Sequence, residues 1–470
     1  MHATHARDDR PWAFLISLTA CAADIRRHMG KADYSYTFVY EAMKPVLERF
    51  GECRVVEAPE SRLDAAADAA RARGLRPLHL AFLPPPSAYY SPSVPTVVLP
   101  AWEFPEVPLR DLGGDPRQDW SRCCRPAAAI WAGSRYSAEA IRAAGLGPVA
   151  VVSAPIPPAA FDVPPWDPSH AWTYRGRHLI LGGSRRAASA GSPPGSIAHR
   201  AYARLVRPLL SPLAVAKVGE ARRDLSRRPK PATALLPEGE VALSGLVFTS
   251  LFNLSDRRKN ARDLISAALS ALGDRPDATL VIKLATSPTR EADEVRELLE
   301  LYRDLGVGHA CRVVVITGYL DDDEMAGLMR ATTFYLNASH AEGACLPIQR
   351  AMATGRPAVA PTNTAMGDYM DHSVGLAVES YPEPTFWPHD PDRRCETTWS
   401  RIVWESLRDQ IRAAADMATR DRSAYDDMAR RARERALIYA GTDAVTSALG
   451  RALGELDRRA RWSGEGRRSA

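Results

Sequence analysis

The chain has 470 residues, of which 46% are hydrophobic and 25% are charged. This composition supplies enough apolar material for a buried core, and a chain of this length is expected to divide into two domains. The formal charge of +5 is small for the size, and the basic excess is concentrated in one interior stretch and at the C-terminus, so a nucleic-acid partner is not expected.

The cysteines and the first residues bear on the compartment. There are seven cysteines, and none of them forms a C-x-x-C pair. This pattern predicts neither a disulfide framework nor a structural zinc site, so we expect reduced thiols. The apolar run 12–23 is too short for a membrane span and lacks the flanks of a signal peptide. We therefore expect a cytoplasmic protein.

Short apolar runs alternate with helical patterns in the first third of the chain. Strands are expected at 13–18, 54–57, 78–83, 96–99, 128–132 and 149–153. Helices are expected at 35–50, 61–73 and 137–144. This alternation predicts a parallel α/β sheet with crossover helices. Residues 1–163 are therefore predicted to form a Rossmann-like domain.

The next segment, 164–240, is rich in Pro, Gly, Ser and Arg, and we predict a linker or insertion without a core of its own. Within it, 197–218 mixes basic with apolar residues, which fits an interfacial helix in peripheral contact with the inner face of a membrane. The alternative is a solvated loop with one docked helix, which Pro208 and Pro212 favour.

The alternation of predicted strands and helices resumes after residue 240. Strands are expected at 246–251, 279–284, 312–317, 334–337, 358–360 and 375–378. These runs predict a second doubly wound domain over 241–398. Helices are expected over 399–460, at 399–415, 423–440 and 443–459, and they are expected to close the fold across both domains. A disordered tail is expected at 461–470.

The most informative segment is 335–357, which reads YLNASHAEGACLPIQRAMATGRP. A buried strand is followed by small polar residues, by Glu342 and Gly343, and by a helix that begins near Cys345 or Leu346. Free amides at the start of such a helix form an anion site, and glycine allows close approach of a ligand. From composition alone, an ordinary loop with a solvated carboxylate is equally expected.

The segment resembles the signature of retaining GT-B glycosyltransferases of family 4, E-G-x-x-L-P-x-x-E-A-M-A-x-G-x-P, which here reads EGACLPIQRAMATGRP. The resemblance implies two Rossmann-like domains that face each other across a cleft, with a nucleotide diphosphate sugar held by the C-terminal domain and an acceptor by the N-terminal one. The family's second glutamate, a ligand of the donor ribose, is replaced by Arg350 beside Gln349. Because arginine only donates hydrogen bonds, ribose recognition must differ here.

A second stretch, 248–260, reads FTSLFNLSDRRKN and resembles the family's strand and R-K-N loop at the diphosphate. Arg258 and Lys259 are the matching cations, and Asn253 precedes them. Two such cations can stabilise a leaving diphosphate without a metal, so neither a metal nor a cofactor is expected. Without the resemblance, a run of three basic residues would indicate a solvated turn.

A third stretch, 313–331, reads VVVITGYLDDDEMAGLMRA and resembles the family's G-Y-L/V segment with its acidic helix start. The resemblance places Gly318 and Tyr319 at the nucleobase. The acidic run that follows fits helix capping better than metal binding.

In the N-terminal half, VPTVVLPAWEFP at 94–105 and WAGSRYSAEAIRAAGLGPVAVVSAP at 131–155 look like the family's W-E and S-x-x-S pieces. Trp102 and Glu103 are therefore candidate acceptor contacts, together with His79 at the end of a strand. The alternatives are that Trp102 belongs to the core and that His79 is a buried imidazole with its hydrogen bonds satisfied.

Together these resemblances imply transfer of a sugar, with retention, to a hydroxyl of a carbohydrate, lipid-linked or small-molecule acceptor, in polysaccharide or secondary-metabolite synthesis. Catalytic roles are expected for Glu342, Lys259 and Arg258. The expected donor-binding residues are Asn253, Gly318, Tyr319, Ser339, Gly343, Ala344, Cys345, Leu346, Gln349 and Arg350. Two alternatives stay open: a catalytically silent relative that binds a nucleotide or carbohydrate as a partner protein, and a phosphorylase-like or nucleotide-sugar-hydrolysing enzyme.

Overall fold

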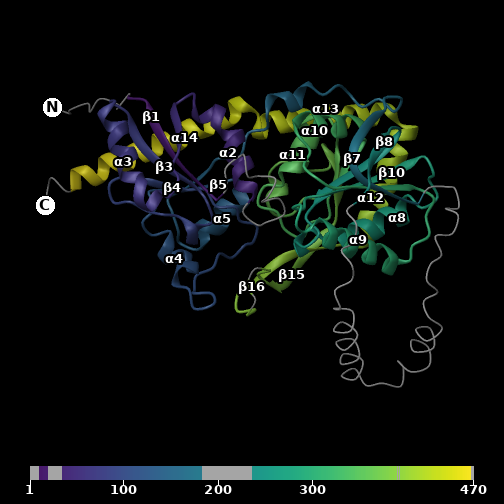
Figure 1. Cartoon of the computed structure of the whole chain (residues 1–470), viewed down its shortest axis with the longest axis horizontal. Helices are drawn as coiled ribbons and strands as arrows, with labels where there is room; N and C mark the ends of the chain where they lie inside the picture. The colour runs from purple at the N-terminus through teal and green to yellow at the C-terminus, as the bar shows by residue number, and fades with distance from the viewer. Residues whose placement is uncertain (1–9, 20–33, 183–235, 389, 391, 467–470) are drawn as a thin grey trace, which may run out of the picture.

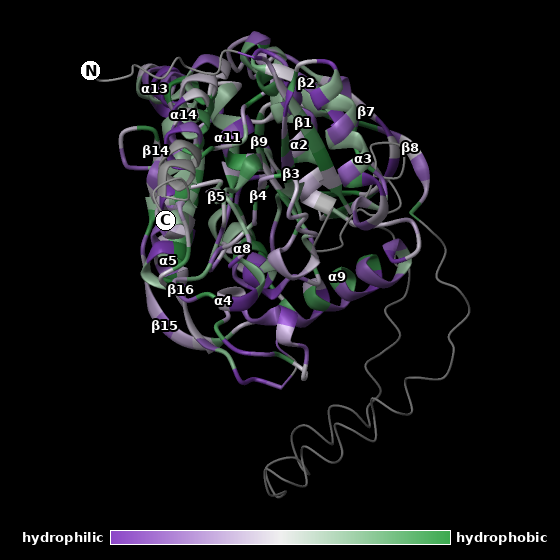
Figure 2. Ribbon diagram, turned by 90° about the vertical axis from the view of Figure 1, so that its left-hand side faces the viewer, coloured by the Kyte–Doolittle hydropathy of each residue, from purple (hydrophilic) through white to green (hydrophobic). Residues whose placement is uncertain are grey.

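The computed structural model describes residues 10–19, 34–182, 236–388, 390 and 392–466. Two lobes lie side by side, each built around its own sheet with helices packed against it (Figure 1). Hydrophobic residues gather in the interior, while the outward faces of helices such as α9 and α13 are hydrophilic (Figure 2). Among the described helices, none is both long and apolar enough to cross a bilayer.

The N-terminal lobe contains a six-stranded parallel sheet in the order β2-β1-β3-β4-β5-β6. Its strands are β1 (Trp12–Leu18), β2 (Gly51–Val55), β3 (Arg76–Phe82), β4 (Thr96–Val98), β5 (Ala129–Ala132) and β6 (Val149–Val151). Its helices are α2 (Tyr34–Leu47), α3 (Pro59–Ala72), α4 (Trp120–Cys123) and α5 (Arg135–Ala143). The residues of β1 between its two ends are buried because helices cover both faces of the sheet.

The C-terminal lobe contains an eight-stranded sheet in the order β14-β13-β12-β9-β10-β11-β7-β8. Its parallel strands are β9 (Leu246–Phe252), β10 (Ala278–Leu284), β11 (Arg312–Ile316), β12 (Phe334–Leu336), β13 (Ala358–Pro361) and β14 (Gly375–Val378). Its helices are α8 (Ala261–Ala271), α9 (Glu291–Leu305), α10 (Asp322–Ala331) and α11 (Leu346–Ala353). The strand order reverses between β9 and β12, which is the place where doubly wound sheets bind ligands. The two predicted Rossmann-like sheets are thus confirmed.

Two further strands correct the expectation of a linker over 164–240. The strand β7 (Trp172–Gly182) pairs antiparallel with β11, and β8 (Glu238–Leu243) pairs antiparallel with β7. Arginines and a glycine separate the apolar residues of β7, and most of its side chains are partly or fully exposed, so the sequence did not indicate a buried strand here. The segment 197–218, for which a membrane-facing helix was one alternative, lies outside the described residues.

The helices α12 (Trp404–Arg420), α13 (Arg422–Ala440) and α14 (Thr442–Gly466) close the fold. Helix α13 packs against α11, and α14 returns to the N-terminal lobe, where Val445 and Leu449 pack with residues of α2 (Figure 1). The expected passage of these helices across both lobes is confirmed. Helix α14 continues to Gly466, so the prediction of a tail from residue 461 is wrong for its first six residues.

A hairpin also differs from expectation. Residues 399–402, predicted to begin a helix, belong to β16 (Glu396–Ile402), which pairs with β15 (Ser380–Phe386). The run ETTWSRI is rich in β-branched and aromatic residues, which suit a strand. The hairpin extends from the C-terminal lobe toward the N-terminal lobe (Figure 1).

Candidate functional site

Two loops at the carboxyl edge of the C-terminal sheet bring the predicted catalytic residues together. The 3₁₀ helix η7 (Arg257–Lys259) follows β9, and Glu342 lies between β12 and α11. Because β9 and β12 are parallel neighbours, their carboxyl ends meet at the switch point of the sheet. Residues far apart in the sequence therefore form one cluster.

The centre of the cluster is a buried ion pair. Lys259 Nζ donates to Glu342 Oε1 at 2.6 Å, and Ser339 Oγ donates to the same oxygen at 2.7 Å. Arg258 Nη1 lies 4.0 Å from Glu342 Oε2. Burial acts to raise the pKa of Glu342, but Lys259 and Arg258 outweigh it and hold the pKa below its ordinary value. Glu342 is therefore a carboxylate at neutral pH.

The backbone of Glu342 is also held in place. Its N–H donates to Thr364 Oγ1 at 3.0 Å, and its carbonyl accepts from Ala365 N at 3.2 Å. Thr364 begins the 3₁₀ helix η8 (Thr364–Asp368) with φ 49°, a backbone conformation that is costly for a β-branched residue. The sequence contains no signal for Thr364, whose role depends on the packing of η8 against the loop.

Helix α11 begins as predicted, directly after Cys345, whose φ is 55°. Gln349 Nε2 and Tyr369 OH donate to the carbonyl of Ala344 at 2.7 and 2.9 Å. The side chain of Gln349 is therefore engaged by the loop that precedes its own helix. Leu346 is the first residue of the helix.

Arg350, the departure from the family signature, forms an ion pair. Its Nη2 lies 2.9 Å from Asp322 Oδ1 at the start of α10. The side chains are 28% and 85% exposed, so the pair lies at the surface. The predicted helix start at Asp321 is confirmed as a capping box with Glu324.

The remaining predicted residues of this lobe lie at the same edge of the sheet. Asn253 follows β9, and its Oδ1 accepts from Ser255 N and Oγ at 3.1 and 2.7 Å, which shapes the turn before η7. Gly318 and Tyr319 follow β11, and Gly318 has φ 83°, which favours glycine. Among the described residues, no group of three or more His, Cys, Asp or Glu is arranged to hold a metal ion.

The N-terminal lobe contributes Glu103, which follows β4 by a few residues. Glu103 Oε1 lies 3.1 Å from Arg258 Nε. A Cβ atom added to Gly343 would lie 2.8 Å from the carbonyl oxygen of Trp102, so only glycine lets the lobes approach at this point. Trp102 is 5% exposed, and its indole packs against Trp120 and other aromatic rings, as its core alternative predicts.

The hydrogen-bond partners of His79 do not belong to the Glu342 cluster. It lies on β3 with no exposed surface, and its ring nitrogens lie 2.8 Å from Ser17 Oγ and 3.1 Å from Thr96 Oγ1. Burial lowers the pKa of His79 to about 4, so the ring is neutral. These contacts match the alternative of a buried imidazole with satisfied hydrogen bonds.

Sequence reasoning missed Asp256. Its Oδ2 accepts from Arg258 Nη2 at 2.7 Å, and its Oδ1 accepts from the Arg258 N–H at 3.2 Å. The sequence did contain a signal for this role, because an aspartate directly before a basic run can cap a short helix and orient the guanidinium.

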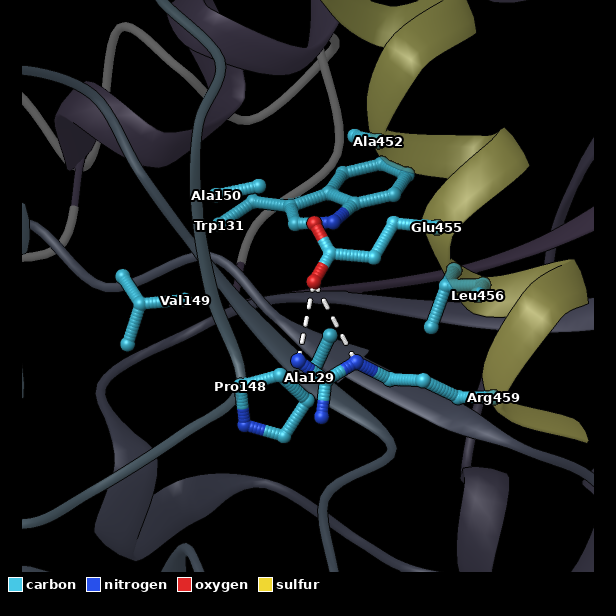
Figure 3. Close-up of a pocket in the computed structure, with 9 residues that line it drawn as sticks. All are labelled: Ala129, Trp131, Pro148, Val149, Ala150, Ala452, Glu455, Leu456 and Arg459. Carbon is cyan, nitrogen blue, oxygen red and sulfur yellow. Dashed lines mark hydrogen bonds and ion pairs between the residues drawn. The ribbon is translucent and has the colours of Figure 1, made fainter. Parts of the chain in front are cut away.

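A small cavity lies elsewhere, between β5, β6 and α14 of the N-terminal lobe (Figure 3). Trp131 forms part of its wall, and its charged lining residues, Glu455 and Arg459, are paired with each other at 2.9 Å. None of these elements carries a residue of the Glu342 cluster, so this cavity does not mark the candidate site.

Part of the C-terminal lobe matches a known family model. Residues 245–385 match the family model described as Glycosyl transferases group 1, a range that includes η7, Glu342 and α11. Comparison with curated proteins gives no match.

Solved structures show the fold over nearly the whole chain. HepE of Anabaena, in complex with UDP and glucose, is 14% identical, with 94% of this chain and 100% of that chain covered and a TM-score of 0.51. A glycosyltransferase of Rickettsia africae is 10% identical, with 95% and 98% covered and a TM-score of 0.52. Sucrose-phosphate synthase of Thermosynechococcus elongatus is 14% identical, with 95% and 99% covered and a TM-score of 0.51. The chain thus has the GT-B glycosyltransferase fold, and its C-terminal lobe carries a segment that matches the Glycosyl transferases group 1 family.

Proposed function

We propose that this protein transfers a sugar from a nucleotide diphosphate sugar to an acceptor hydroxyl, with retention and without a metal ion. The observation that carries the proposal is the buried pair of Lys259 and Glu342, with Arg258 beside it, at the switch point of the C-terminal sheet. The match of 245–385 to Glycosyl transferases group 1 includes all three residues and supports the same reading.

The diphosphate would lie against the cations and the start of α11. Arg258 and Lys259 supply positive charge, and the first amides of α11 point out of the helix N-terminus, where anions are stabilised. The complex of Anabaena HepE with UDP and glucose, which has the same fold, supports a nucleotide and a sugar as ligands here.

The chemistry then needs few groups from the protein. As the bond from the sugar to the diphosphate breaks, negative charge grows on the departing phosphate, and Arg258 and Lys259 stabilise it. In front-side transfer the same phosphate takes the proton of the acceptor hydroxyl, so the protein mainly orients both substrates. Glu342, which is ionised, accepts hydrogen bonds from hydroxyls of the donor sugar.

The acceptor would bind on the N-terminal lobe beside Trp102 and Glu103. A carbohydrate, a lipid-linked sugar or a small molecule each offers the required hydroxyl, and mass spectrometry of the product identifies which is used. We place the reaction in the cytoplasm, a location supported by the free thiols of all six described cysteines.

A binding screen tests the donor site first. The melting temperature is measured with UDP, GDP, ADP, CMP and dTDP, each with and without magnesium, because a ligand of the folded state raises it. A magnesium-independent rise with one nucleotide is expected. The absence of a rise with any of them contradicts the proposal.

A turnover assay separates transfer from its alternatives. Glu342→Ala is expected to remove transfer, and Lys259→Ala is expected to weaken nucleotide binding by about 1.5 to 3 kcal/mol. Nucleotide binding without product indicates a silent relative, whereas release of free sugar or sugar phosphate indicates a hydrolase or phosphorylase.

A further inference from the structure

The two lobes meet directly at the candidate site. A charged link between them is the pair of Glu103 Oε1 and Arg258 Nε, 3.1 Å apart, with side chains 12% and 14% exposed. Arg258 is one of the two cations assigned above to the donor diphosphate. Its guanidinium has a carboxylate partner from the opposite lobe.

The charges around Arg258 do not balance. Three carboxylates, those of Glu103, Asp256 and Glu342, surround two cations, Arg258 and Lys259. With all three carboxylates ionised, these five side chains have a net negative charge before any ligand enters. A diphosphate that joined them would add further negative charge in a buried space, where like charges repel strongly.

Of these three carboxylates, Glu103 is the one whose pKa is raised and not lowered. Burial raises the pKa of Glu103 despite the nearby Arg258, and Asp256 and Glu342 act in the same direction as burial. The pKa of Glu342, by contrast, is lowered because Lys259 contacts it directly. Without Glu103 the two remaining carboxylates match the two cations.

Glu103 is held at this position by its neighbours in both lobes. The preceding residue, Trp102, lies against Trp387 from the loop of the β15–β16 hairpin, with ring centroids 5.7 Å apart. Nearby, Thr397 Oγ1 on β16 donates to Glu106 Oε2 at 2.7 Å. Contacts from both lobes therefore hold the loop that carries Glu103 opposite Arg258.

We propose that Glu103 competes with the donor diphosphate for Arg258, and that it thereby sets the affinity for the nucleotide. In the ligand-free protein Glu103 takes the position of an anion on the guanidinium. When the donor binds, Arg258 exchanges Glu103 for a phosphate oxygen. This inference rests on the proposed function, because it requires that Arg258 contacts the diphosphate.

The test measures binding of UDP and of inorganic pyrophosphate by calorimetry to the wild type and to Glu103→Gln, Arg258→Ala and the double variant. Glu103→Gln keeps the size of the side chain and removes its charge. It is expected to bind at least one probe about tenfold more tightly than the wild type, since a competing charge is lost. The gain is expected to vanish in the Arg258→Ala background.

Glu106→Gln is the matched control. Glu106 is another carboxylate of the same loop that contacts the opposite lobe, but its partner there is the Thr397 hydroxyl. Its affinity for both probes should equal that of the wild type. Glu103→Ala is a second variant that must change affinity in the same direction as Glu103→Gln if the glutamine variant does not fold.

Each result supports or overturns the competition between Glu103 and the diphosphate. Unchanged or weaker binding by the Glu103 variants, or an equal gain in Glu106→Gln or in the Arg258→Ala background, overturns the competition. If Arg258→Ala nevertheless loses the binding that the wild type shows, the proposed function stands. If wild type and Glu103 variants bind neither probe, both the competition and the proposed donor site fail.

Discussion

Removal of the cation from the buried pair at the site should cost far more stability than the same change at the surface. Lys259→Met keeps the aliphatic stem and removes the ammonium that lies 2.6 Å from Glu342 Oε1. The two side chains are only 20% and 5% exposed, so the carboxylate cannot be rehydrated without local rearrangement. Breaking a buried pair by removing one partner costs about 3 to 5 kcal/mol.

The lower part of that range is expected here. Arg258 stays 4.0 Å from the other carboxylate oxygen, and Ser339 still donates to Glu342. We therefore expect Lys259→Met to lower the free energy of unfolding by about 3 kcal/mol. Adding Glu342→Gln should recover about half of this loss, because a neutral amide needs no cation.

The chain offers a control at Arg350. Arg350→Met breaks an ion pair of 2.9 Å, but the partner Asp322 is 85% exposed, so the expected loss is below about 1 kcal/mol. Urea unfolding followed by circular dichroism gives both values. A loss in Lys259→Met no larger than that in Arg350→Met would refute the reasoning.

The same pair predicts a pH dependence with a defined sign. The pKa of Glu342 in the folded protein lies below its ordinary value. The pair therefore contributes its full stability above about pH 4.3, the value for an unfolded glutamate, and loses it as pH falls through the lower folded pKa. The stability advantage of the wild type over Glu342→Gln should thus shrink on acidification and not at alkaline pH.

Three further outcomes are expected. Burial lowers the pKa of His79 from 6.5 to about 4, so its protonation should lower the free energy of unfolding by up to about 3 kcal/mol as pH falls from 6.5 to 4. Urea titrations of His79→Gln should lack this pH dependence. Gly343→Ala places a Cβ 2.8 Å from the Trp102 carbonyl oxygen, whereas a Cβ at Gly308 meets nothing within 4 Å; only the former should enlarge the radius of gyration in X-ray scattering. Asp321→Ala removes the capping box of α10 and should cost about 1 kcal/mol in thermal unfolding; an unchanged melting temperature would contradict this role.

Local patterns in the sequence determined most of the architecture. Buried runs such as β9 and β10 are mostly apolar, and each is followed by a helix, so the parallel sheets could be predicted from the pattern of the sequence. The start of α11 near Cys345 and the cap at Asp321 could also be predicted, because both depend on residues within a few positions of each other.

The tertiary structure alone decided the contacts between distant segments. The strand β7 is amphipathic and carries arginines, so only its pairing with β11 shows that it belongs to the sheet. The hairpin β15–β16 and the neutral, fully bonded state of His79 depend in the same way on neighbours far along the chain.

The candidate site illustrates the same division. Arg258, Lys259 and Glu342 could be proposed as candidates from the sequence because each lies in a short motif that resembles the family's. The pairing of Arg258 with Glu103 could not, because the two residues belong to different lobes and are separated by more than a hundred positions. Side-chain periodicity carries information about which face of an element is buried, but not about which charge from another lobe will lie against it.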